Sequence, residues 1–184
     1  MPTIANKYYH TLDAYGIDKA LAEGKAWYPE AWAFCRTAAR FHNITPERVA
    51  AVVAVTSPRT RWQKNIQATV DILQDVEKPV HKRQKSYGIL GANAAKGILV
   101  ANDRYYSRHV TGPKVTNFYL NILGHTDPIT VDSIMSKAAG YGSDVNNKVR
   151  AEVEAAVRIL SPVFDMNPRD MQAAIWIAYR GSAA

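Results

Sequence analysis

The spacing of the apolar residues constrains the fold of this chain more than any other feature of its sequence. Apolar side chains recur at intervals of three and four positions, as in amphipathic helices, and the alternation typical of strands is nearly absent. We therefore expect an all-α protein with eight to ten short helices. The expected helices cover residues 5–24, with breaks at Gly16 and Gly24, and residues 28–42, 46–56, 62–75, 90–101, 113–123, 131–140, 146–159 and 168–179.

Helix starts are clearest where a capping residue precedes a proline. Thr45 can cap a helix whose first turn holds Pro46, and Asn167 repeats this pattern, with Asp170 placed to close a capping box. The stretch 49–55 is apolar on every side. A strand is the alternative structure for this valine-rich stretch, but the cap before it favours a helix. We predict that this helix is central and buried.

The composition is that of one globular domain. The chain has 184 residues, of which 47% are hydrophobic and 21% charged. No stretch has the apolar core of a signal peptide or the roughly 20 apolar residues of a membrane span. We expect a soluble, cytoplasmic monomer with no membrane partner. Residues 78–86 are expected to form a basic surface loop, either a solvated connector or a DNA contact.

Charge and cysteine content narrow the classes of partner and cofactor. The net charge of +7 and the pI of about 9.5 favour a nucleic-acid partner, with simple solubility as the alternative. Cys35 is the single cysteine, which excludes an intrachain disulfide and a Cys-ligated iron–sulfur or zinc site, and its apolar neighbours predict a buried thiol. The five histidines lack the spacing of metal ligands, so we expect neither a metal nor another cofactor.

One stretch combines a glycine turn, a cation and a carboxylate. Gly112 lies between two helical patterns, Pro113 begins the second of them, and Lys114 follows. Such a turn exposes backbone N–H groups that bind phosphate, although a plain interhelical turn is the alternative. Asp132 precedes a helix at 133–139, where it is either only an N-cap or a functional carboxylate stabilised as an anion.

Three segments resemble the helix-hairpin-helix DNA glycosylase superfamily, in particular its endonuclease III-like branch. There a Gly-Arg-Lys-Thr-Ala turn precedes Val-Asp-Thr-His; this chain has Gly-Pro-Lys-Val-Thr from Gly112 and Val-Asp-Ser-Ile around Asp132. Lys114 and Asp132 are eighteen positions apart, as in that branch. The segment 54–69 is similar to the family's Leu-Leu-Ser-Ala-Gln-Ala-Thr stretch, and residues 87–98 resemble the helix before the hairpin.

The resemblance covers about residues 45–142 and implies two helical lobes with a groove between them, within one domain. Lobe A would comprise about residues 45–130, with the hairpin at 108–118, and lobe B residues 1–44 plus 131–184. The partner it implies is DNA with a flipped base. The cysteines of the iron–sulfur members are missing, so no cluster is expected.

The resemblance also implies roles for individual residues. Asp132 would be the catalytic carboxylate, and Lys114 either a Schiff-base nucleophile for lyase chemistry or a cation that holds a phosphate. Arg59 would fill the gap left by the everted base. Further DNA contacts are expected from Gly112, Thr111, Pro113, His109, Arg61 and Trp62, and a base pocket from Trp176, Gln172 and Trp27, with core packing as the alternative for the aromatic residues.

Two positions depart from the family pattern. Val110 stands where the hairpin usually has its first glycine, and Ile134 replaces the histidine that follows the aspartate. The expected function is that of a DNA N-glycosylase in base excision repair, acting on a damaged or modified base, with AP lyase activity as a further option. The alternatives are a bacteriophage-type enzyme that helps to replace or hypermodify DNA bases, a non-catalytic helix-hairpin-helix DNA-binding module, and a helical protein–protein adaptor.

Overall fold

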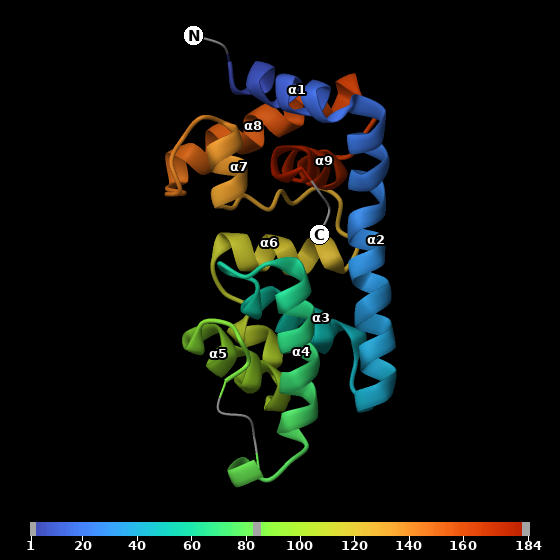
Figure 1. Cartoon of the computed structure of the whole chain (residues 1–184), viewed down its shortest axis with the longest axis vertical. Helices are drawn as coiled ribbons and strands as arrows, with labels where there is room; N and C mark the ends of the chain where they lie inside the picture. Colours follow the sequence, from blue (N-terminus) through green and yellow to red (C-terminus); the bar gives the residue numbers. More distant parts are fainter. Residues whose placement is uncertain (1–2, 83–85, 182–184) are drawn as a thin grey trace. The chain divides into compact units, whose positions relative to one another are not determined.

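The computed structural model describes residues 3–82 and 86–181, and these residues form nine α-helices and two 3₁₀ helices without any strand. The predicted all-α class is therefore confirmed. The chain divides into two compact units, each described below by itself (Figure 1). The terminal unit comprises Met1–Glu30 and Gly124–Ala183, and the central unit comprises Ala31–Leu123. Lobe A, the lobe expected to hold the hairpin, covers about residues 45–130.

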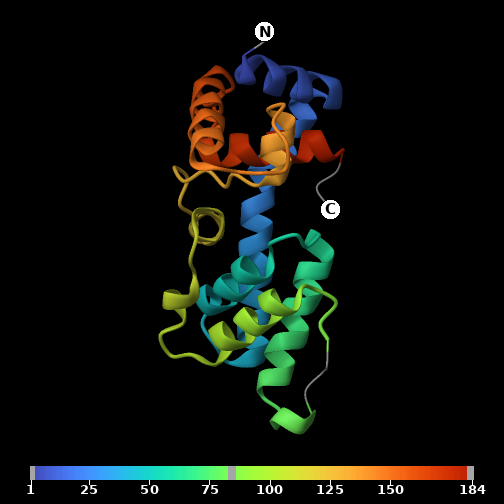
Figure 2. The same ribbon diagram turned by 90° about the vertical axis from the view of Figure 1, so that its left-hand side faces the viewer.

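The terminal unit is built on packing between helices from both ends of the chain. It contains α1 (Ile4–Tyr15), the first part of α2 (Ile17–His42), α7 (Ser133–Ala138), α8 (Asn147–Val163) and α9 (Pro168–Arg180). Helix α1 packs against α8 and α9, and α7 packs against α9 (Figures 1 and 2). Tyr8, Met135, Val153 and Ile175 are fully buried between these helices. Burial of this apolar surface is the main force that stabilises the unit.

The central unit surrounds one buried helix. It contains the rest of α2, followed by α3 (Pro46–Thr56), α4 (Trp62–Val76), η1 (Val80–Lys82), α5 (Gly91–Asn102), η2 (Tyr106–His109) and α6 (Pro113–Ile122). Every residue from Val49 to Thr56 is buried, which confirms that α3 is central. Helices α3, α4 and α5 pack on one another, as Figure 2 shows. Gly97 permits this close packing, because a Cβ atom there would lie 2.8 Å from the Thr56 side chain.

The predicted helix caps form, with one difference. The Thr45 hydroxyl accepts a hydrogen bond from the Arg48 N–H at 3.3 Å, and the Asn167 side chain accepts one from the Asp170 N–H at 2.9 Å. The Asp170 carboxylate accepts its bond from the Asn167 side-chain amide at 2.6 Å. In a capping box that carboxylate would instead bond the backbone N–H of the cap residue. Asp170 therefore anchors the capping side chain itself.

The expected helix break at Gly24 is wrong. Helix α2 runs without interruption from Ile17 to His42, and only Gly16, with φ +98°, separates it from α1. Gly24 is buried where α2 meets α9: a Cβ atom there would lie 2.7 Å from the Asp170 carbonyl oxygen. The glycine therefore serves close packing, a tertiary requirement that the local pattern does not reveal.

Other expectations concern the cysteine, the basic loop and the membrane. Cys35 is fully buried, as predicted, and burial raises the pKa of its thiol to about 12. Of the basic loop, residues 83–85 lie outside the described residues. Within the described ranges no helix is both long and apolar enough to cross a membrane, and no three metal-binding side chains are grouped.

Candidate nucleic-acid interface and carboxylate site

The positive charge of the chain is concentrated in the central unit. Residues 31–123 contain fourteen Lys and Arg against five Asp and Glu, a net charge of +9. The remaining residues contain nine against eleven, a net charge of −2. A polyanion is therefore attracted to the central unit rather than to the molecule as a whole.

The N-cap residues of the helices also differ between the two units, and this difference again favours anion binding at the central unit. The N-cap residues of α4, α5 and α6 are Arg61, Leu90 and Gly112, and none of these three helices has a side-chain cap or an acidic residue in its first turn. In the terminal unit, side chains cap α1, α7, α8 and α9. Backbone N–H groups at a helix start carry partial positive charge and bind anions when no side chain occupies them. Three helices of the central unit have such starts.

A pocket of about 540 Å³ lies between the starts of α4 and α5. Its lining residues are Arg59, Thr60, Arg61, Lys64, Gly88, Ile89 and Leu90. Arg59 and Arg61, both expected to contact DNA, thus line one pocket together with Lys64, which the sequence analysis missed. The signal for Lys64 was its position three residues after Arg61 on a helix, which places both on one face. Trp62, the first residue of α4, is half-buried and is not among the lining residues.

The loop that carries Arg59 is held on both sides. Asn65 is 1% exposed, and its side-chain amide donates to the Val53 carbonyl at 3.0 Å, at the C-terminal end of α3. Asn93, from α5, donates to the Pro58 carbonyl at 2.7 Å. Between these anchors Arg59 has φ +57°, in the left-handed region that non-glycine residues rarely adopt. The surrounding contacts therefore fix the backbone from which this guanidinium extends.

The part of the pocket wall formed by residues 88–90 is anchored by a buried carboxylate. Asp75, at 0% exposure, accepts hydrogen bonds from the Tyr87 hydroxyl at 3.2 Å and from the Lys78 ammonium at 2.8 Å. Tyr87 immediately precedes Gly88, where this wall begins. Asp75 thus has a structural role next to the pocket segment, and no acidic residue is among the described residues that line the pocket.

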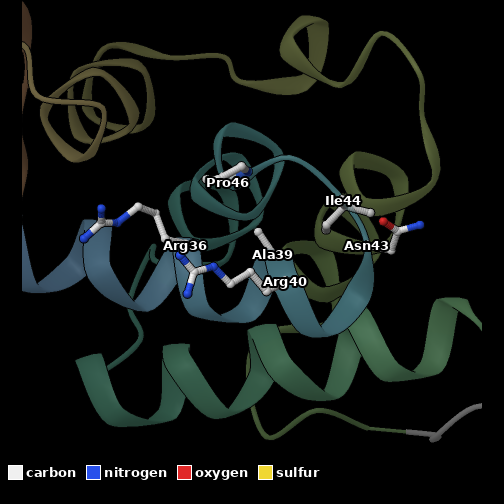
Figure 3. Close-up of a pocket in the computed structure, with 6 residues that line it drawn as sticks. All are labelled: Arg36, Ala39, Arg40, Asn43, Ile44 and Pro46. Atoms are coloured by element: carbon white, nitrogen blue, oxygen red, sulfur yellow. The ribbon is translucent and has the colours of Figure 1, made fainter.

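A second pocket of the central unit, about 290 Å³ in volume, was not predicted. Its lining residues are Arg36, Ala39, Arg40, Asn43, Ile44 and Pro46. Figure 3 shows the Arg36 and Arg40 side chains extending along α2, while the Asn43 side chain points away from them. Neither arginine forms an ion pair with another described residue. This pocket adds positive charge at a place that shares no lining residue with the first.

The segment between η2 and α6 turns at Gly112, within the expected hairpin at 108–118. Gly112 has φ +88° and is followed by α6, whose first residue is Pro113, as expected. Lys114 lies half-buried in the first turn of α6, and the exposed Thr111 hydroxyl accepts a hydrogen bond from Lys96 at 2.9 Å. Space for a Cβ atom is available at position 112, so crowding does not require a glycine there. The positive φ angle does favour one, because residues with a side chain rarely adopt it.

His109 is held by an acidic residue that the sequence analysis did not single out. Its Nε2 atom lies 2.6 Å from Asp103 Oδ2, which also accepts from Arg108 at 2.7 Å. Asp103 Oδ1 accepts from the Tyr105 N–H at 2.8 Å. This backbone bond, the side-chain hydrogen bonds with His109 and Arg108 and the charge of Arg108 lower the pKa of Asp103. The expected phosphate contact of His109 therefore competes with an intramolecular partner.

Asp132 is the N-cap of α7, and both of its oxygens are used. Oδ1 accepts from the backbone N–H groups of Ile134 at 2.9 Å and Met135 at 3.0 Å. Oδ2 accepts from the indole N–H of Trp176 at 3.2 Å. Three donors and the positive end of a helix thus surround one half-buried carboxylate. The arrangement is compatible with a cap alone and with a stabilised functional anion.

Aromatic residues cluster around Trp176, the partner of Asp132. The rings of Trp27 and Trp176 are 6.1 Å apart and those of Trp27 and Tyr28 4.8 Å apart, and the Arg180 guanidinium lies 4.5 Å from the Trp176 ring. Gln172 is 4% exposed and accepts from the Tyr28 hydroxyl at 2.9 Å. Burial raises the pKa of Tyr28, which keeps this donor protonated.

The terminal unit thus brings together residues that the sequence analysis selected for two separate roles. The candidate catalytic residue Asp132 lies beside Trp176, and the candidate base-pocket residues Trp27 and Gln172 belong to the same cluster. Lys114 belongs to the central unit, and the structure describes each unit by itself. The expected meeting of Lys114 and Asp132 across one groove stays a prediction.

Comparison with known proteins yields a family. No curated protein and no solved structure matches the chain. A family model matches residues 12–183, which is almost the whole sequence. The chain therefore belongs to this family, DUF7178, a family of unknown function.

Proposed function

We propose that the protein is a DNA N-glycosylase-like enzyme that acts on a flipped damaged or modified base. The observation that carries the proposal is the cluster of Asp132, Trp176 and Trp27, because a carboxylate beside aromatic rings suits base release from a sugar. In this proposal the central unit binds the DNA backbone, and Asp132 in the terminal unit supports the chemistry.

The central unit supplies what binding to a phosphate backbone requires. Its net charge of +9 attracts the polyanion, and α4, α5 and α6 begin at N-cap residues that form no side-chain cap, so the positive ends of these helices favour an anion. Lys114 and Thr111 lie at the start of α6, where the hairpin would contact a phosphate. Such contacts position the DNA and carry no sequence information, so the identity of the base depends on the terminal unit.

The proposed reaction breaks the bond between C1′ and the base nitrogen. The bonding electrons leave with the base, and positive charge develops on the sugar. The Asp132 carboxylate, which accepts three hydrogen bonds, stabilises that charge. Water then adds to C1′, and the proton that it releases balances the one taken up by the departing base. If the Lys114 amine attacks C1′ in place of water, a Schiff base forms and the strand can be nicked.

A second candidate function is a DNA-binding module without chemistry. It is favoured by the hydrogen bonds of Asp132, since a carboxylate that caps α7 and accepts from Trp176 has a complete structural role. Both functions predict DNA binding that weakens with salt, with a slope in log–log form of roughly −0.9 for each neutralised phosphate. Only the enzyme predicts base release.

The test is incubation with duplexes that each carry one modified base, including hypermodified thymines. Abasic sites are read by alkaline cleavage, and Schiff bases by borohydride trapping. We expect base release from at least one substrate by the wild type and loss of release in Asp132→Asn. The matched control is Asp127→Asn, which makes the same chemical change at an exposed carboxylate of the same unit, paired with Arg158.

The outcomes separate the candidates. Equal loss of activity in both variants would show that Asp132 has no special role, and DNA binding without base release on any substrate would favour the binding module. Absence of salt-dependent DNA binding would refute both. Borohydride adducts that persist in Lys114→Ala would remove the lyase role from that residue.

A further inference from the structure

The pocket between the starts of α4 and α5 has two chemically different sides. One side carries Arg59, Arg61 and Lys64, three exposed cations that form no ion pair with a described residue. The other side is apolar and consists of Ile89 and Leu90. Leu90 is 50% exposed, so it has apolar surface that a ligand can cover. A ligand that satisfies both sides is anionic at one end and apolar at the other.

The size of the pocket supports a ligand larger than a phosphate ion. Its volume of about 540 Å³ falls within the range of roughly 300–1,000 Å³ found for small-molecule sites. A phosphate alone gains nothing from the apolar side at Leu90. Nucleotides combine a phosphate with a ring system whose faces pack on apolar side chains. Their two parts match the two sides in chemistry.

We propose that this pocket binds one unpaired nucleotide, with its phosphate on Arg59, Arg61 and Lys64 and its base or sugar on Ile89 and Leu90. The same chemistry is available from a free nucleoside monophosphate and from an unpaired nucleotide of a DNA strand. This site goes beyond the proposed function, because it lies in the central unit and requires neither Asp132 nor base release.

The anchored walls favour a defined site over a diffuse basic surface. The Arg59 side is fixed through the Asn93 bond to the Pro58 carbonyl, and the Leu90 side follows Tyr87, which is bonded to the buried Asp75. The two sides are thus held before a ligand arrives. A site whose walls are already held loses less conformational entropy on binding than one assembled by mobile side chains.

The experiment measures binding of thymidine 5′-monophosphate, thymidine and inorganic phosphate to the full chain by calorimetry. We expect the monophosphate to bind at least tenfold more tightly than thymidine, because thymidine lacks the contacts to charged groups, and more tightly than inorganic phosphate. Arg61→Gln combined with Lys64→Gln should weaken the monophosphate and inorganic phosphate by about tenfold. Leu90→Ala should weaken the monophosphate about threefold and leave inorganic phosphate unchanged.

The matched control is Arg36→Gln combined with Arg40→Gln, which removes two charges at the other pocket of the same unit. It should leave monophosphate binding unchanged; equal weakening would show a general charge effect and overturn the site. The proposal also fails if the monophosphate binds no better than inorganic phosphate, or if Leu90→Ala has no effect on it.

Oligothymidylate of about eight nucleotides distinguishes the two sources of the nucleotide. Competition with the monophosphate, lost in the Arg61→Gln and Lys64→Gln double variant, assigns the pocket to a strand. Monophosphate binding that the oligonucleotide does not displace assigns it to a free nucleotide. Base release by the wild type and by Asp132→Asn is measured in a separate assay. A failure of the glycosylase proposal therefore does not change the conclusion drawn from nucleotide binding.

Discussion

The hydrogen bond between Asp132 and Trp176 can be tested as a coupled pair. Asp132→Asn keeps one oxygen to cap α7, and Asn caps about as well as Asp. The second group becomes an amide NH₂, which then faces the indole N–H of Trp176, so that two donors oppose each other at a position where the native distance is 3.2 Å. We expect the free energy of unfolding to fall by about 1.5–2 kcal/mol, the lower end of the range for a hydrogen bond to a charged group.

Two further variants separate the cap from the indole contact. Asp132→Ala loses both, and its free energy of unfolding should fall by about 2–3 kcal/mol. In Trp176→Phe the indole donor is gone, so adding Asp132→Asn to this variant should cost only a few tenths of a kcal/mol. The coupling energy of the double-mutant cycle is then about 1 kcal/mol.

The assay is urea unfolding of the four proteins in the cycle, followed by circular dichroism. For a chain of this length, 1 kcal/mol corresponds to a change of roughly 2–4 °C in Tm, which provides a second readout. A coupling energy near zero would refute the reasoning. It would mean that the Asp132 side chain contributes to stability only through the cap of α7.

Three other predictions concern packing and charge. Gly24→Ala should lower the free energy of unfolding by about 1–3 kcal/mol, because its Cβ atom would lie 2.7 Å from the Asp170 carbonyl oxygen; unchanged urea stability would contradict this packing. Asn65→Ala should cost about 1–3 kcal/mol, since the Val53 carbonyl loses a buried donor, and an equally stable variant would show that water replaces it. Asp103, whose pKa is lowered, contributes stability that is present above the ordinary aspartate pKa of about 3.9 and is lost as the pH falls through the lowered value. Wild type should therefore be more stable than Asp103→Asn at pH 7, and the difference between their urea midpoints should shrink as the pH falls below about 3.9. A difference that does not change with pH would argue against a stabilised Asp103 carboxylate.

Local sequence signals predicted most of the helices, because periodicity and capping act within a few residues. Thr45 and Pro46 mark the start of α3, and the apolar run after them reports burial on every side. The Gly112 turn and the Pro113 start of α6 follow from the same chemistry. Gly24 misled the prediction because its function depends on contact with α9, more than 140 residues later in the chain. A glycine that permits close packing and one that ends a helix look alike in sequence.

The candidate sites were harder to predict, because their parts come from distant positions. In the pocket between the starts of α4 and α5, most of α4 and the segment after it separate the cations from Leu90 in sequence, so no local pattern joins them. Asp132 was found from a motif, yet its bond to Trp176 spans 44 residues. His109 was predicted to contact phosphate, and the structure adds Asp103 as its partner. No sequence motif links these two residues, so their contact became clear only from the structure.

The uncapped helix starts of the central unit argue against a purely structural role for its charge. A Ser, Thr, Asp or Asn at an N-cap position stabilises a helix by about 0.5–2 kcal/mol relative to Ala, and Arg61 and Leu90 forgo this gain. Gly112 forgoes only a few tenths of a kcal/mol. The surplus of positive charge in the same unit adds repulsion. Anions bound at these helix starts offset both costs, because they interact favourably with the positive helix ends and with the surplus cations. We infer that the free central unit is less stable than its bound form, and that DNA which binds it should raise its unfolding midpoint more than that of the terminal unit.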